Sequence, residues 1–118
     1  MDDLSNEELS TQSSKPLLVS ITRVLEADAE EKTTGLMKSD HELLLANLQH
    51  HLNEDQIPVK KIGLGVFYYF HLLDNVKLQK LVTKEMIQSL MAFMFKNMRE
   101  VPMNDVAICL QFLDFLDN

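Results

Sequence analysis

The chain has little of what interrupts helices or cross-links secreted proteins. Its 118 residues include no tryptophan, one cysteine, three glycines and three prolines. A single cysteine cannot form an intrachain disulfide, which argues against a disulfide-stabilised secreted scaffold. With 46% hydrophobic residues and so little glycine and proline, the composition indicates a globular, helical chain. Its length fits one domain or a piece of a larger array.

Positive charge is also scarce. The chain has 11 Lys and Arg residues against 18 Asp and Glu, and a formal net charge of −7. Phosphate binding requires clustered cations, and Lys60 and Lys61 are the only adjacent pair. We therefore predict no nucleic-acid partner, while the acidic balance favours basic partners by electrostatic steering.

Long apolar runs are absent. The longest, Ile62–Phe70, is about half of what a membrane span needs, and the first residues lack the basic and apolar regions of a signal peptide. We therefore expect no membrane association and an intracellular protein, cytoplasmic or nuclear. Residues 1–14 are polar and acidic; they predict a flexible N-terminal tail in front of a helical domain at 15–118.

Apolar residues spaced three and four apart predict helices through that domain. The first begins at Lys15 with Ser14 as N-cap. The second runs from a capping box at Ser39–Glu42 to about Asn53. The third, Pro58–Asp74, is apolar on nearly all sides, so we expect it to be central and to bury Phe67 and Phe70.

Three further helices are expected in the second half. They are a short helix over Val76–Val82, a long one from Lys84 to about Met98 after the N-cap Thr83, and a last one from about Asp105 to Leu116. Periodicity predicts that the long helix buries Ile87, Leu90, Met91, Met94 and Phe95. No stretch alternates apolar and polar residues with β-branched enrichment, so no strands are predicted.

Parts of the chain resemble each other at a spacing of 43 residues. Phe67–Asn75 aligns with Leu110–Asn118, and Leu44, Leu48 and Leu52 align with Ile87, Met91 and Phe95. Such a period indicates stacked helical units. The short segment Asn75–Val82 followed by Met86–Leu90 resembles the short helix and groove-lining helix of armadillo repeats. The resemblance to the armadillo and HEAT families implies an all-α stack of helical hairpins, an α-solenoid of about two and a half units.

Repeats of this kind build surfaces, so the resemblance implies a non-enzymatic scaffold that binds a peptide or helix of another protein. In stacked repeats the partner lies along the surface made by the last helix of each unit. That surface is predicted to present Gln49, Asn53, Gln88, Ser89, Phe93, Lys96 and Asn97. Phe93 would serve as its apolar anchor, or would instead pack against a further helix or a second copy of the chain.

The alternative is a homo-oligomerisation domain that uses the open ends of the stack or its Phe and Met face. The last helix carries apolar residues on more than one side and ends without a glycine cap. Exposed apolar surface at a stack end needs a cover, which is either a further repeat downstream or a second chain. If a second chain covers it, a homodimer contact is predicted at Phe112, Phe115 and Leu116.

Residues that could carry chemistry are few. His50 and His51 are adjacent and diverge on a helix, and no zinc-like spacing occurs. Cys109 has the setting of a small core residue, with no activating base in the sequence. Gly63 and Gly65 lie within a helix, where close approach of a neighbouring helix, or of a ligand or partner backbone, would explain them. We therefore predict no catalytic residue, metal or cofactor. A small helical-bundle enzyme or ligand carrier is the least favoured alternative.

Overall fold

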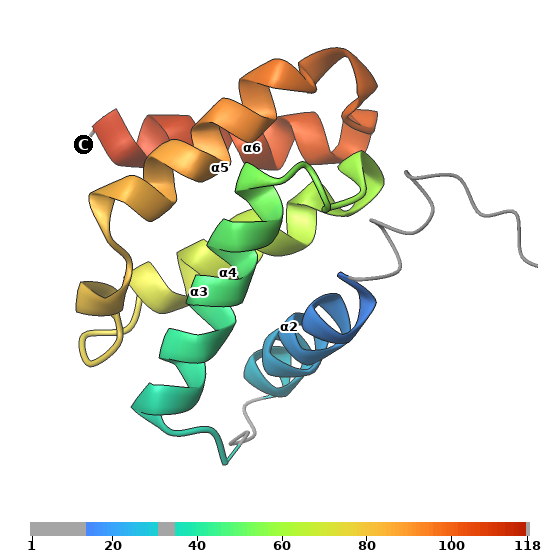
Figure 1. Cartoon of the computed structure of the whole chain (residues 1–118). Coiled ribbons are helices and arrows are strands. Elements are labelled where there is room, and N and C mark those ends of the chain that lie inside the picture. Colours follow the sequence, from blue (N-terminus) through green and yellow to red (C-terminus); the bar gives the residue numbers. More distant parts are fainter. Residues whose placement is uncertain (1–13, 31–34, 118) are drawn as a thin grey trace, which may run out of the picture.

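A computed structural model describes residues 14–30 and 35–117, and within them every regular element is helical. Apart from Ser14, the predicted tail lies outside the described residues. The longer helices are α2 (Lys15–Ala29), α3 (Lys38–Asn53), α4 (Ile62–Leu73), α5 (Lys84–Lys96) and α6 (Met103–Asp117) (Figure 1). Single turns of 3₁₀ helix occur at Val59–Lys61, Gln79–Leu81 and Met98–Glu100. The all-α prediction is confirmed.

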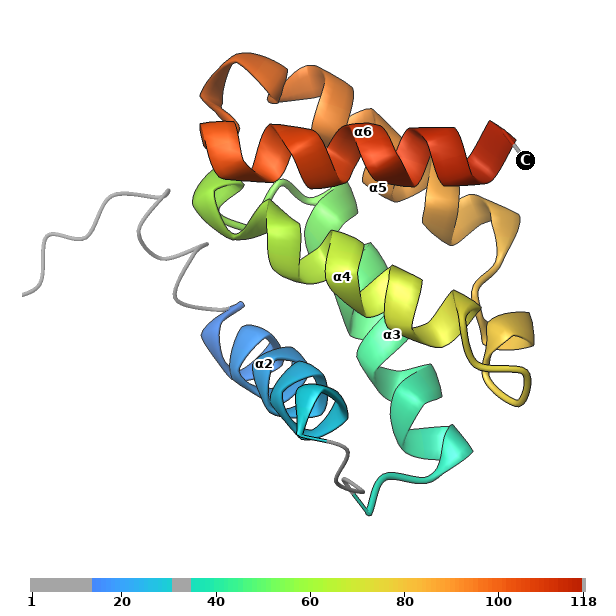
Figure 2. The same ribbon diagram turned by 180° about the vertical axis from the view of Figure 1, so that it is seen from behind.

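The helices form two layers. In one, α4 packs between α2 and α6; in the other, α3 packs on α5. Figure 2 shows α2, α4 and α6 running in the same general direction, with α3 and α5 behind them. Neighbours within a layer are therefore alternate helices in the sequence, and the carboxyl ends of α2, α4 and α6 point the same way.

Helix boundaries follow local signals with two corrections. Thr83 caps α5 as predicted, since its Oγ1 accepts a hydrogen bond from Met86 N at 3.3 Å. However, α3 begins before Ser39: its N-cap is Met37, whose N–H donates to Asp40 Oδ2 at 2.8 Å. The short helix expected over Val76–Val82 is reduced to the 3₁₀ turn. A carboxylate two residues before the predicted Glu42 therefore accepts a hydrogen bond at the α3 terminus.

The core is centred on α4, as its composition predicts, but with different aromatic residues. Tyr68 and Tyr69 are fully buried, whereas Phe67 is 47% exposed and Phe70 is half-buried. Phe67 and Tyr69 are two residues apart and so project from nearly opposite sides of the helix. Burying Tyr69 between the layers turns Phe67 to solvent, and the prediction of a buried Phe67 is wrong.

The glycines of α4 have different surroundings. A Cβ on Gly63 would lie 2.8 Å from Asp105 Oδ1 of α6, which is closer than real Cβ contacts. The atoms that this Cβ would meet all belong to the end of the Asp105 side chain and not to the α6 backbone, so the predicted close approach of a neighbouring helix at Gly63 stays a prediction. A Cβ on Gly65 would meet Leu48 and Leu90 side chains at 3.9 Å, an ordinary contact. Neither glycine contacts the backbone of a neighbouring helix among its nearest atoms.

Only some positions 43 residues apart have matching environments in α4 and α6, since Tyr68 and Leu72 are buried whereas their counterparts Gln111 and Phe115 are exposed. Val66 and Cys109 are buried, as are Tyr69 and Phe112, while Phe67 and Leu110 are exposed. The match fails between α3 and α5, where Leu52 is buried but Phe95 is 59% exposed. The predicted burial of Phe95 is therefore wrong.

Candidate protein-interaction site

The predicted partner surface on α3 and α5 comes together in space but lacks its apolar anchor. The two helices pack side by side, yet Phe93 is only 3% exposed. Phe93 follows Leu90 by three residues, about one helical turn, and both side chains point into the core. The assignment of Phe93 as an exposed anchor is therefore wrong.

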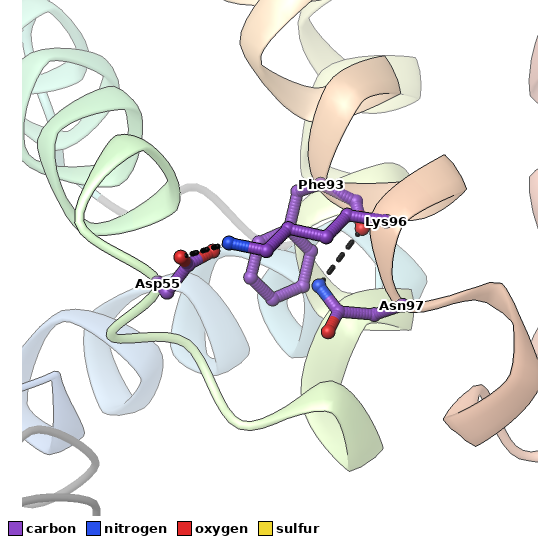
Figure 3. A network of polar contacts seen from close by, with 4 residues as sticks. All are labelled: Asp55, Phe93, Lys96 and Asn97. Atoms are coloured by element: carbon purple, nitrogen blue, oxygen red, sulfur yellow. Dashed lines mark hydrogen bonds and ion pairs between the residues drawn. The ribbon is translucent and has the colours of Figure 1, made fainter.

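The polar residues of that surface are partly engaged within the chain (Figure 3). Lys96 Nζ forms an ion pair with Asp55, which follows α3. The Asn97 side-chain amide donates to Phe93 O at 3.0 Å. Among the other predicted contacts, Asn53 and Gln88 are exposed, and Gln49 and Ser89 are half-buried. The Lys96–Asp55 ion pair links α5 to the end of α3. Fewer polar side chains of this surface are therefore available to bind a partner.

The three residues of the predicted oligomer contact also differ in burial. Phe112 is fully buried because its ring packs edge-on against Phe70, with centroids 5.2 Å apart, and contacts Tyr69. It belongs to the core, which corrects its assignment. Phe115 is 46% exposed and Leu116 half-buried. Only Phe115 offers substantial apolar surface.

Phe115 takes part in a groove that the sequence does not reveal. This aromatic groove, of about 570 Å³, lies across the α2–α4–α6 layer and is lined by Leu25, Asp28, Phe67, Phe70, His71, Asp74, Asn75 and Phe115. Phe70 forms an edge-to-face contact with Phe115 at 5.4 Å. The exposed rings of Phe67 and Phe115 therefore flank a third aromatic ring that α6 holds in place.

The electrostatic character of the aromatic groove is negative. Asp28 lies in the last turn of α2 and Asp74 is the C-cap of α4. Helix carboxyl ends carry partial negative charge, and α2, α4 and α6 point theirs in the same direction (Figure 2). No basic residue occupies the last turn of α2 or α6. The groove is suited to a positively charged ligand.

A buried polar cluster supports the groove from behind. His41 on α3 is buried, and its Nδ1 lies 2.9 Å from the Tyr68 hydroxyl. Burial, together with nearby His71, lowers the pKa of His41, and burial raises the pKa of the Tyr68 hydroxyl. His71 in turn places its Nδ1 3.5 Å from Asp28 Oδ2. The cluster joins three helices, and sequence reasoning, which treated these histidines singly, missed it.

The remaining residues considered for catalysis or metal binding have features of structural residues. Cys109 is buried, and burial with nearby Asp105 raises the pKa of its thiol, which disfavours the nucleophilic thiolate. In the part of the chain that the structure describes, no group of three or more His, Cys, Asp or Glu side chains could hold a metal ion. None of the described helices has the length and apolar character to span a membrane.

The aromatic groove is thus the strongest candidate site. It combines two exposed phenylalanines with two carboxylates and three helix carboxyl ends. Comparison of this chain with protein-family models, with curated proteins and with solved structures finds no match.

Proposed function

We propose that the protein is a non-enzymatic interaction module that binds an apolar, basic segment of another protein in the aromatic groove. The observation that carries this proposal is the exposure of Phe67 and Phe115, 47% and 46%, beside Asp28 and Asp74. Large aromatic anchors dominate binding energy at protein interfaces. The carboxylates select Lys or Arg in the partner and speed its association.

We further propose that the fold is a stack of about two and a half helical hairpins of the armadillo or HEAT kind. The pairing of α2 with α4 and α6, and of α3 with α5, supports it. So does the burial of Val66 with Cys109 and of Tyr69 with Phe112, two pairs of positions that lie 43 residues apart in α4 and α6. In this proposal the groove lies across the first helices of the units, not along the last ones as the sequence predicts.

The test is a selection of random displayed peptides on the purified chain. We expect the enriched peptides to carry an aromatic or long aliphatic residue next to Lys or Arg. Affinity for the best peptide should fall by more than about 30-fold in Phe67→Ala/Phe115→Ala, the loss of a hot spot worth about 2 kcal/mol. It should also weaken at higher ionic strength, because salt screens exposed charges.

The matched control is Phe95→Ala, which removes a phenylalanine that is 59% exposed and lies outside the groove. Binding in this variant should equal that of the unmodified chain. Enriched peptides that bind the groove variant as well as they bind the Phe95→Ala control would disprove the site. A selection that enriches nothing would count against the function itself.

A homo-oligomer is the second candidate, favoured by a different surface. Phe95, Leu110 and Met103 of α5 and α6 are exposed at 59%, 56% and 85%, and they carry no charge. Covering them with a second copy would remove apolar surface from water. Light scattering over a range of concentrations should then report a dimer that Phe95→Ser/Leu110→Ser converts to monomer. A chain that stays monomeric at all concentrations would exclude the homo-oligomer and leave the interaction module as the proposed function.

A further inference from the structure

The α2–α4–α6 layer carries a second groove of opposite charge. It runs beside α2 and meets the start of α4, with a volume of about 620 Å³. Lys15, Arg23 and Lys61 line it, and Lys60 lies in a smaller adjoining hollow that shares Thr22, Lys61 and Leu64 with it. Leu18, Val19, Pro58 and Leu64 supply apolar surface. We call these two hollows together the basic groove.

The cations of the basic groove are not neutralised by the folded domain. Among the described residues, Lys96 forms an ion pair with Asp55, and His71 Nδ1 lies 3.5 Å from Asp28 Oδ2. Neither contact involves the groove. Lys15, Arg23, Lys60 and Lys61 outnumber the lining carboxylates Glu26 and Asp105. The first turn of α2 contains no acidic residue, so its partial positive charge adds to theirs. In a chain of net charge −7, this region is the exception.

The sequence that precedes α2 has the complementary chemistry. Residues 1–14 contain Asp2, Asp3, Glu7 and Glu8 and no Lys or Arg. Leu4 and Leu9 are interspersed among these carboxylates. The segment joins the domain at Ser14, next to Lys15, which itself lines the basic groove.

We propose that residues 2–9 of the chain itself bind in the basic groove. The carboxylates pair with Arg23, Lys60 and Lys61, and the leucines cover the apolar surface around Leu18 and Leu64. This contact is independent of any partner in the aromatic groove.

The length of the chain and its covalent attachment to the domain favour residues 2–9 over an acidic segment of another protein as the occupant of the basic groove. The five residues from Leu9 to Ser14 span at most roughly 17 Å, and α2 rises about 17 Å from Lys15 to Glu26. The segment can therefore lie along the whole groove after turning back at Ser14. A short tether gives an effective concentration of about millimolar. Even weak ion pairs that are screened by salt suffice at that concentration.

The experiment compares amide chemical shifts in the full-length, ¹⁵N-labelled chain. The first variant, Asp2→Asn/Asp3→Asn/Glu7→Gln/Glu8→Gln, removes charge at constant length. It should shift the amides of Thr22, Lys61 and Leu64, while those of Gln88 and Ala107, outside the groove, keep their positions. Raising the ionic strength tenfold on the unmodified chain should move the same resonances in the same direction.

The reciprocal variant, Arg23→Gln/Lys61→Gln, should shift the amides of Leu4 to Leu9. Its matched control is Lys77→Gln/Lys80→Gln, which removes two exposed lysines outside the groove and should leave those amides in place. Thermal unfolding verifies that each variant is folded. Shifts that stay within residues 1–14 when the acids are neutralised would overturn the proposal. Groove shifts that grow with protein concentration would also overturn it, because they indicate binding to a second copy.

Discussion

The two ends of the α2–α4–α6 layer carry opposite charge although they are built from the same three helices. At the carboxyl ends, Asp28 and Asp74 surround exposed phenylalanines. At the amino ends of α2 and α4, Lys15 and Lys61 surround aliphatic side chains. Because the helices run in parallel (Figure 2), their dipoles add instead of cancelling, and each end reinforces the charge of its side chains.

The comparison also shows how differently the two grooves are supported. The aromatic groove rests on packed rings, since Phe70 contacts both Phe112 and Phe115, and on the buried His41–Tyr68 pair behind it. The basic groove is lined mostly by exposed or half-buried side chains. Changes behind the aromatic groove should therefore affect stability, whereas changes in the basic groove should affect charge alone.

The largest effect is expected from Phe112→Ala, which removes the fully buried ring beneath the aromatic groove. The free energy of unfolding should fall by about 3–5 kcal/mol, measured by urea denaturation. Phe115→Ala, on the same helix but 46% exposed, should cost less than about 1 kcal/mol. Equal losses in the two variants would mean that the groove has no packed base.

Tyr68→Phe should have the next largest effect, because it leaves the buried His41 Nδ1 without its partner. An unsatisfied buried polar group costs about 1–3 kcal/mol. Tyr69→Phe is the matched control: its hydroxyl donates to Met86 O at a longer 3.3 Å. This variant should lose no more than the net value of a hydrogen bond, about 1 kcal/mol. The prediction fails if Tyr68→Phe is the less damaging of the two.

A smaller loss is expected on acidification. The pKa of His41 in the folded chain is lowered from 6.5, mainly by burial, so the unfolded chain binds more protons near that pH. Stability from this group is complete above pH 6.5 and is lost as the pH falls below it. Unfolding at pH 7.5 and 5.5 should show a drop that His41→Gln reduces and the exposed-site control His50→Gln keeps. Identical pH dependence in both variants would exclude His41 as the cause.

The smallest effects concern the dipoles themselves. Asp74→Asn removes a negative charge at the carboxyl end of α4 and should raise stability by about 0.3–1 kcal/mol. It should also weaken binding of a basic peptide in the aromatic groove. Asp105→Asn, in the first turn of α6, should lower stability by a similar amount. Thermal unfolding at low salt measures the stability of both variants. Stability changes of the same sign would contradict the opposite charge of the two ends of the α2–α4–α6 layer.

Much of the fold could be read from local sequence. Thr83 caps its helix, Pro16 starts one, and the stripe of Leu17, Ile21 and Val24 is buried as its spacing predicts. The errors concern aromatic residues two positions apart. On α4, Phe67 points in nearly the opposite direction to Tyr69, and on α5, Phe95 points in nearly the opposite direction to Phe93. Periodicity cannot choose between them where apolar residues occur on both sides.

The candidate site could not be read from the sequence because its parts are distant along the chain. Asp28, Phe67 and Phe115 belong to three helices, and none of them stands in a recognisable motif. His41 and Tyr68 are 27 residues apart, and each alone has the signature of an ordinary helical residue. The predicted surface on α3 and α5 was correct in joining those helices, but the packing buries its anchor.

By itself the sequence determined that the chain is helical and where its long helices lie. Those properties depend on side-chain spacing and on capping groups within a few residues of each other. The tertiary structure alone decided which aromatic rings reach solvent and which charges gather at each end of the layer. Those outcomes depend on the rotation and direction of each helix relative to its neighbours, which contacts between distant residues fix.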